Sequence, residues 1–250
     1  MVDPESNGRA NHQNGDDSGL PPEDDDLVVT FTGVSARPNE DGTIDLVIGT
    51  NRGDIRAILH PREGQDGAVI FIGGGRELKG PADGIYEEVA RELTARGVTS
   101  LRLGQRRPEV FIEAVADVLA GISFMRGIGA ARLALVGHSS NGAVAIKSAA
   151  FSPHVTAVAS LSGQTFGAQD VAEIAPRRLL VVHGREDDVL PYTDAERIYE
   201  WAGEPKELIL YPDADHRLVA AKTELRDKLE SWLVQAVGPA DSADPPSEAR

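Results

Sequence analysis

Three residues in the second half of the chain have the types and the order needed for nucleophilic catalysis by a serine. Ser139 lies in the turn Gly137-His-Ser139, after the apolar run 133–136 and before small residues typical of a packed helix. Asp187 and His216 follow in that order. A serine hydroxyl is a weak nucleophile unless a base takes its proton and backbone N–H groups face the reacting carbonyl. The pattern therefore favours an exposed serine between a strand and a helix, with its acid and base supplied later.

The acidic partner has close competitors in the sequence. Asp187 is preferred to Glu186 and Asp188 because its spacing from Gly184 fits the turn after a strand. The base, His216, also has acidic neighbours in Asp213 and Asp215, which lie so near in sequence that their side chains are expected to face solvent.

The other histidines have simpler explanations than catalysis. His138 is adjacent to Ser139, so it is interpreted as a structural companion in the turn rather than a base. His12 is interpreted as a tail residue and His60 as a strand-end residue. His154 is interpreted as a loop residue, and His183 as a packing residue at a strand end.

The elements around these residues alternate between strands and helices. After three short β-rich runs, expected to be antiparallel strands at a sheet edge, the pattern becomes repeated βα units with apolar strands, which predicts a mostly parallel sheet covered on both faces. The predicted strands are 27–32, 43–48, 54–59, 68–72, 99–103, 132–136, 156–161, 179–183 and 207–211, and the predicted helices are 82–96, 108–125, 141–151, 193–202 and 218–237. No helix of the size of a lipase lid fits between 161 and 176.

Further candidates follow other strands of the predicted sheet, where the reactive groups of such sheets gather. Arg106 and Arg107 are candidates for holding a substrate carboxylate, or they form a surface pair beside Glu109. Gln164 is either a pocket residue or a turn residue. The glycine run 73–75 lacks the spacing of a nucleotide-binding loop. The spacing of histidines and carboxylates does not indicate a metal site.

With these elements in place, the sequence resembles the α/β-hydrolase superfamily, and within it the dienelactone-hydrolase-like serine esterase group, over about 29–237. The motifs that carry the resemblance are Gly137-His-Ser-Ser-Asn-Gly142, His183-Gly-x-x-Asp187-x-x-Leu-Pro191 and Pro212-x-x-x-His216. The resemblance implies Ser139 as nucleophile, His216 as general base and then acid, and Asp187 as the orienting carboxylate. It also implies an oxyanion hole formed by Ser140 and by Gly74 or, alternatively, Gly75.

This chain departs from the pattern of that group at three points. Asn141 stands where a glycine is usual two residues after the nucleophile, which leaves less room in the turn. Ile72 stands where the superfamily often has a histidine. Dienelactone hydrolases proper use a cysteine nucleophile, and this chain contains no cysteine.

Composition narrows the function further. The chain has 250 residues and a net charge of −15, which argues against a nucleic-acid partner. Segment 1–26 has few apolar residues and is predicted to be a disordered acidic tail, 27–237 to be one α/β-hydrolase domain, and 238–250 to be a flexible tail. No run is apolar enough to span a membrane and the start lacks the features of a secretory signal, so a cytoplasmic location is expected.

The residues and the resemblance together predict a serine hydrolase that cleaves a small ester or related acyl substrate through an acyl-enzyme, without a cofactor. Two alternatives remain open. The same triad would also serve an acyltransferase or an amide or thioester hydrolase. In a different class, the fold would be a ligand-binding module without catalysis.

Deleting residues 1–26 should leave the melting temperature and the turnover of any substrate nearly unchanged, because a segment that buries no apolar surface contributes little to folding. Thermal unfolding and activity assays of the truncated and full-length chains test this. A large loss of either property would show that the segment docks on the domain.

Overall fold

The computed structural model describes residues 28–64, 66–74 and 77–238. The strands form one sheet in the order β1-β2-β3-β5-β4-β6-β7-β8-β9. They are β1 (Phe31–Pro38), β2 (Ile44–Thr50), β3 (Gly53–His60), β4 (Gly67–Ile72), β5 (Thr99–Leu103), β6 (Arg132–His138), β7 (Val155–Leu161), β8 (Arg178–Gly184) and β9 (Lys206–Tyr211). The helices are α1 (Pro81–Ala95), α2 (Phe111–Gly127), α3 (Ser140–Phe151), the 3₁₀ helix η2 (Gln169–Ile174), α4 (Thr193–Trp201) and α5 (Lys222–Val237).

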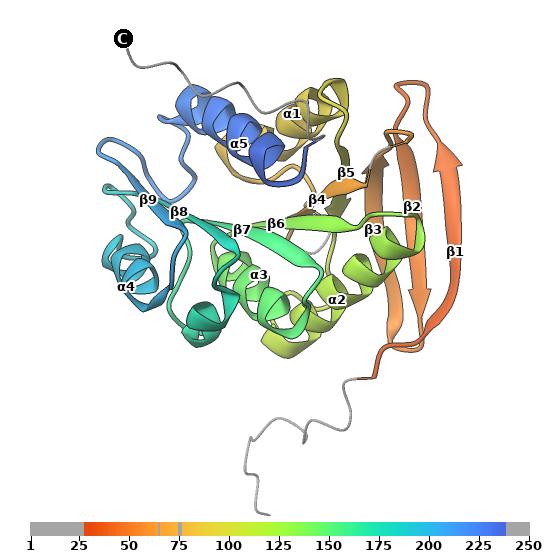
Figure 1. Cartoon of the computed structure of the whole chain (residues 1–250), viewed down its shortest axis with the longest axis horizontal. Helices are drawn as coiled ribbons and strands as arrows, with labels where there is room; N and C mark the ends of the chain where they lie inside the picture. Colours follow the sequence, from red (N-terminus) through yellow and green to blue (C-terminus); the bar gives the residue numbers. More distant parts are fainter. Residues whose placement is uncertain (1–27, 65, 75–76, 239–250) are drawn as a thin grey trace, which may run out of the picture.

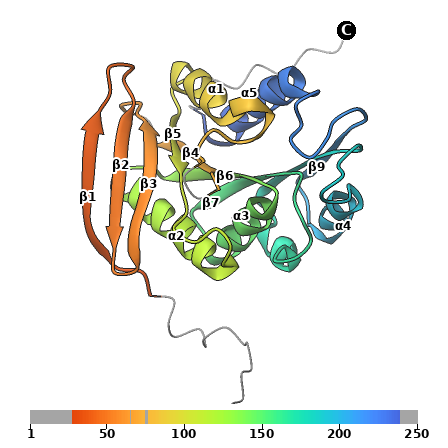
Figure 2. The ribbon, with the colours of Figure 1, turned by 180° about the vertical axis from the view of Figure 1, so that it is seen from behind.

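The sheet is covered by helices on both faces. Figure 1 shows α1 and α5 above the sheet and α2, α3 and α4 below it, and Figure 2 shows the same layers from behind. The first three strands pair antiparallel and β3 joins β5 antiparallel, whereas all neighbours from β5 to β9 are parallel. The predicted fold class is therefore confirmed, including the antiparallel strands at the N-terminal edge.

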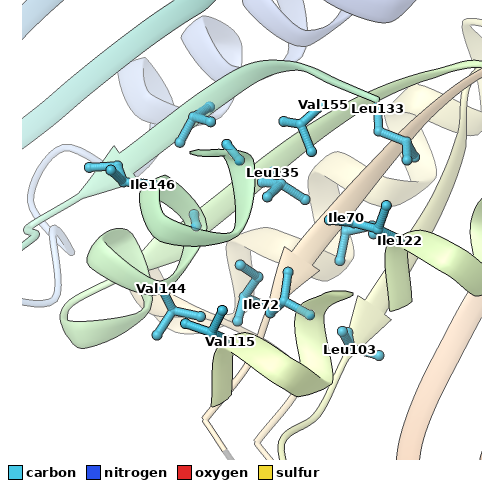
Figure 3. Packing of buried hydrophobic residues seen from close by; sticks show 14 of the residues in the cluster. Ile70, Ile72, Leu103, Val115, Ile122, Leu133, Leu135, Val144, Ile146 and Val155 are labelled. Carbon is cyan, nitrogen blue, oxygen red and sulfur yellow. The ribbon is translucent and has the colours of Figure 1, made fainter. Parts of the chain in front are cut away.

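Alternating side chains of the central strands form two apolar layers. In β4, Ile70 and Ile72 pack toward α2 and α3, whereas Val69 and Phe71 pack toward α1 and α5. Figure 3 shows the first layer, where these isoleucines meet Val144 of α3 and neighbouring side chains of α2 and β6. A strand buried on both faces needs apolar residues at every position, which explains the continuous apolar runs of the sequence.

The chain reverses its direction of winding between β4 and β6. From β4 it crosses to β5 on one side, and it then returns to place β6 on the other side of β4. In open α/β sheets the loops that leave such a pair of strands diverge to opposite faces and open a crevice at their carboxyl ends. Gly73 and Gly74 after β4 and Ser139 after β6 all lie at this crevice.

Two elements begin four residues later than predicted. The strand predicted at 27–32 lies at Phe31–Pro38, because the hairpin is closed at Asn39, whose N–H bonds Thr43 O at 2.8 Å. The helix predicted from residue 218 begins at Lys222. Leu218 instead takes a φ of 59° in a turn in which its N–H bonds Asp215 O.

The connection between β7 and β8 contains the short helix η2 but no α-helix, as its length predicted. The predicted tail 1–26 lies outside the described residues, and of 238–250 only Gly238 is described. Across the described parts of the chain, every helix is too short or too polar to cross a bilayer.

A buried histidine ties β3 to β5 and α1. His60 is 3% exposed, and its Nε2 accepts a hydrogen bond from Arg102 Nε at 3.1 Å, while Arg102 also pairs with Glu87 at 3.3 Å. Burial, together with the Arg102 charge, lowers the pKa of His60 to about 4. Protonation would remove the acceptor that Arg102 uses.

His60→Gln should make the protein less sensitive to acid. Between the unfolded pKa of about 6.5 and the folded value, only the unfolded chain binds the proton, so stability falls as the pH drops through this window, by on the order of 2 kcal/mol. Glutamine keeps an acceptor without titrating. Thermal unfolding between about pH 7 and about pH 5 should show a smaller loss in His60→Gln than in the parent or in the surface control His154→Gln. Parallel losses in all three would contradict the assignment.

Candidate active site

Ser139 occupies a strained turn between β6 and α3. Its φ of 59° and ψ of −130° lie in a region that residues with a side chain rarely adopt. Two backbone hydrogen bonds hold it there, from Ser139 N–H to Leu161 O and from Gly142 N–H to Ser139 O, both at 2.9 Å. Gly137 lets the chain turn so tightly, since a Cβ at that position would lie 2.0 Å from Asn141 O. The predicted turn between a strand and a helix is thus present, and it places a half-buried Ser139 directly after the end of β6.

The predicted acid and base are in direct contact. His216 Nδ1 lies 2.8 Å from Asp187 Oδ2, and the Asp187 side chain is fully buried. Burial raises the pKa of Asp187, but hydrogen bonds from the N–H of Leu190, from His216 and from the N–H of Val189 together hold it below its usual value. The buried carboxylate therefore stays ionised at neutral pH and can orient the His216 ring.

The loops that carry this pair are bonded to each other. Arg185 N–H donates to Tyr211 O at 2.8 Å, and Glu186 N–H donates to Ala214 O at 3.0 Å. Gly184 permits the approach, because a Cβ there would lie 2.1 Å from Ala214 O. These contacts fix the Asp187 loop against the His216 loop.

The His216 loop is also bonded to the elements around Ser139. His138 Nε2 donates to His216 O at 2.8 Å, and the two rings lie 4.8 Å apart. Ala82 N–H at the start of α1 donates to Arg217 O at 2.8 Å. Burial lowers the pKa of His138 to about 4, so at neutral pH this ring is an uncharged donor that supports the base.

A cavity of about 680 Å³ lies beside Ser139, between the loop after β4 and the start of α3. Gly74 and Ser140, the predicted oxyanion donors, both line it. The N–H of Ser140 is at a helix N-terminus, where no intrahelical carbonyl is available to it. A Cβ at Gly74 would find no atom within 4 Å, so the backbone there is open toward the cavity. Gly75, the alternative donor, lies outside the described residues.

The hydroxyl of Ser139 makes no hydrogen bond to His216 within the described part of the chain. Catalytic contacts of this kind are often loose in ligand-free enzymes and tighten around bound substrate. Ser139, Asp187 and His216 lie on neighbouring loops, and the Asp187 and His216 side chains are already hydrogen-bonded.

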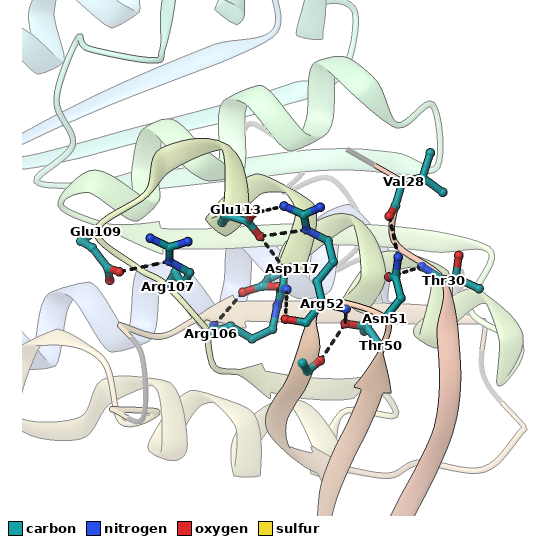
Figure 4. A network of polar contacts seen from close by, with 11 residues as sticks. Val28, Thr30, Thr50, Asn51, Arg52, Arg106, Arg107, Glu109, Glu113 and Asp117 are labelled. Carbon is teal, nitrogen blue, oxygen red and sulfur yellow. Dashed lines mark hydrogen bonds and ion pairs between the residues drawn. The ribbon is translucent and has the colours of Figure 1, made fainter. Parts of the chain in front are cut away.

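Arg106 is not brought to the cavity. Figure 4 shows it in a network with Arg52, Glu113 and Asp117. Its Nε pairs with Asp117, one terminal nitrogen donates to Arg52 O at 2.7 Å, and the other lies 3.0 Å from Glu113 Oε2. With every guanidinium nitrogen engaged, Arg106 joins the β2–β3 turn to α2 and has no free group for a substrate.

Arg107 and Gln164 also lie apart from the residues that line this cavity. The Arg107 side chain is 60% exposed and lies 3.5 Å from Glu109, which is the surface pair foreseen as the alternative. Gln164 Nε2 donates to Phe166 O at 3.2 Å within its own turn.

His183 contacts the triad, which the interpretation as a packing residue missed. Its Nε2 lies 2.9 Å from Asp187 Oδ2, and both side chains are fully buried. The spacing of four residues between a strand-end histidine and the predicted acid, Asp187, is the signal that could have revealed this contact.

Comparisons with known proteins agree with this geometry at the level of the fold. Est1E from Butyrivibrio proteoclasticus superposes with a TM-score of 0.66 at 15% identity, covering 77% of this chain and 98% of that one. Dienelactone hydrolase from Anabaena variabilis gives 0.65 at 17% identity, covering 82% and 99%. An alpha-beta serine hydrolase homologue from Coxiella burnetii gives 0.66 at 18% identity, covering 80% and 99%. The chain has the α/β-hydrolase fold.

Sequence relatives match a segment only. The uncharacterized protein YfhR of Escherichia coli O157:H7 is 32% identical over 83 residues, which are 32% of this chain and 28% of that protein. YfhR of Escherichia coli K12 is 42% identical over 57 residues, 23% and 19% of the two chains. The match thus spans less than a third of these relatives. No family model matches the sequence.

Asn141 fits into the turn after Ser139, and the close glycine contact of this turn is made by Gly142. Asn141 is 8% exposed, accepts a hydrogen bond from Gln105 Nε2 at 2.9 Å and donates to Ile72 O at 3.4 Å. The position that must be glycine is the next one, because a Cβ at Gly142 would lie 2.3 Å from Ser160 Oγ. Asn141 thereby links the nucleophile turn to the ends of β4 and β5.

Gly142→Ala should destabilise the fold by about 1–3 kcal/mol, since the added methyl group overpacks a fully buried contact with β7. Thermal unfolding measures the loss. Gly127→Ala is the matched control, because Gly127 is also helical but a Cβ there meets no atom within 4 Å, and its stability should be unchanged or higher. Equal stabilities of the two variants would contradict the packing described for the turn.

Proposed function

We propose that this protein is a serine hydrolase that cleaves a small ester or related acyl compound through an acyl-enzyme. The observation that carries the proposal is the placement of Ser139 in a strained turn beside a cavity, with the paired Asp187 and His216 on loops bonded to that turn. Neighbours of the same fold include esterases.

In the first half of the reaction, His216 Nε2 takes the proton of Ser139 Oγ as the oxygen attacks the substrate carbonyl carbon. The carbonyl π electrons move to oxygen and form a tetrahedral oxyanion. The imidazolium then gives the proton to the leaving oxygen, the bond to the alcohol breaks, and the acyl group stays on Ser139. Asp187 holds the ring by its Nδ1 throughout.

In the second half, water enters beside the acyl group. His216 takes one proton from the water as its oxygen attacks, and it returns that proton to Ser139 Oγ when the tetrahedral intermediate collapses. The products are a carboxylic acid and the free enzyme. All proton transfers use the same imidazole, so no cofactor is needed for the balance.

The oxyanion is stabilised by the backbone N–H groups of Ser140 and Gly74. Preorganised donors of this kind contribute about 3–4 kcal/mol each to the transition state. Both residues line the cavity into which Ser139 faces. Gly75 is the alternative to Gly74.

The substrate is proposed to be small. The cavity volume of about 680 Å³ is within the range of small-molecule sites. Its lining combines polar side chains such as Glu77, Lys79 and Arg217 with few apolar ones, and no α-helix intervenes between β7 and β8 to cover it. This combination suits a short, polar acyl compound better than a long lipid.

A fluorophosphonate probe tests the proposal directly, because it phosphonylates only an activated serine. At neutral pH the intact protein should gain one adduct, mapped to Ser139. Ser139→Ala should gain none, and Asp187→Asn should react slower by a factor on the order of 10⁴, since the wrong imidazole tautomer is then favoured.

Ser35→Ala, on the exposed strand β1, is the matched serine control and should label like the parent. A folded parent protein that takes up no probe would contradict the proposal and favour a ligand-binding role. Labelling at another serine would also contradict it.

A further inference from the structure

His183 lies at the carboxyl end of β8 and is fully buried. Its Nε2 is 3.1 Å from Leu190 O and 2.9 Å from Asp187 Oδ2. A carbonyl oxygen and an ionised carboxylate can only accept hydrogen bonds, so Nε2 must carry the proton, which it donates to Leu190 O while Asp187 Oδ2 lies beside it. The imidazole therefore clamps the turn from Asp187 to Leu190 from inside the protein.

Each oxygen of the Asp187 carboxylate faces two nitrogens, and three of these four contacts are hydrogen bonds. Oδ1 accepts from the N–H of Val189 at 2.9 Å and of Leu190 at 2.8 Å. Oδ2 meets His216 Nδ1 and His183 Nε2 at nearly equal distances. A carboxylate whose oxygens both face fixed nitrogens has one orientation. That orientation fixes the direction in which it holds the His216 ring.

Packing alone does not account for an imidazole at this position. The other ring nitrogen, His183 Nδ1, is buried with no hydrogen-bond partner in the described part of the chain. An unpartnered buried nitrogen is costly, and a leucine of similar size would avoid that cost. The contacts of Nε2 are what offset it.

We propose that His183 is a positioning residue of the triad, which donates its imidazole N–H to Leu190 O, holds the Asp187–Leu190 turn beside the carboxylate and so sets the alignment of His216. This inference rests on the proposed serine hydrolase function and extends it from three side chains to four. His183 touches neither substrate nor the reacting atoms. It acts through the carboxylate.

The test compares His183→Leu, which removes the donor, with His183→Gln, whose side-chain amide places an N–H near the position of Nε2. The second-order rate of fluorophosphonate labelling at Ser139 is measured for the full-length chain. The rate should fall about 10-fold in His183→Leu, because the Asp187–Leu190 turn loses the hydrogen bond that holds it, and stay within about threefold in His183→Gln.

Val181→Ala is the control for general destabilisation, because Val181 is fully buried two residues earlier in β8. It should lower the melting temperature without changing the labelling rate. A second readout needs no reactivity: in proton NMR with ¹⁵N-labelled histidine, the hydrogen-bonded His216 Nδ1–H resonance should shift or broaden in His183→Leu and stay in place in His183→Gln and Val181→Ala.

Parent-like labelling and an unmoved His216 resonance in His183→Leu would overturn the proposal. Equal losses in His183→Leu and His183→Gln would also overturn it, because the N–H would then not be the operative feature. If the parent protein itself does not label, the hydrolase function fails, while the NMR comparison still decides whether His183 aligns His216.

Discussion

The site depends on one buried negative charge. Asp187 is fully buried, and an isolated carboxylate in such a place would take up a proton. It remains ionised because backbone N–H groups and imidazoles face both of its oxygens. Each of these donors is fixed by the fold, since the turn after β8 supplies the N–H groups, β8 supplies His183 and the loop after β9 supplies His216.

To hold the Asp187 carboxylate near Ser139, the loops that carry these residues must approach neighbouring backbone closely. Glycines stand where two chains approach most closely, at Gly137 in the nucleophile turn and at Gly184 between the two loops of the acid and base. Both contacts lie at the carboxyl edge of the parallel strands, near the crevice that the reversal between β4 and β6 opens. At this edge, hydrogen bonds from Ser139 N–H to Leu161 O and from Gly142 N–H to Ser139 O hold Ser139 in its strained conformation.

Much of this arrangement could be predicted from the sequence because its signals are local. The apolar runs predicted the strands, the Gly137-His-Ser139 turn predicted a serine between a strand and a helix, and Asp187 and His216 were predicted as partners and lie in contact. The contacts of side chains across the fold were not local. Arg106 was a candidate for substrate binding until the structure placed it between Asp117 and Glu113.

Two further differences have the same origin. His183 is buried at the end of β8 as predicted, but its contact with Asp187 was not foreseen, because the histidine was interpreted without the carboxylate four residues later. The first strand was placed about four residues early, since its position depends on the hairpin turn at Asn39 and not on its own apolar residues.

The most direct test of the central claim, an acyl-enzyme on Ser139, is rapid acid quenching of the protein after mixing with p-nitrophenyl acetate, followed by intact mass and peptide mapping. The account predicts one acetyl group on Ser139, formed together with a burst of about one equivalent of p-nitrophenol. Turnover that persists at the parent rate in Ser139→Ala, with no acetyl group on the parent protein, would contradict it.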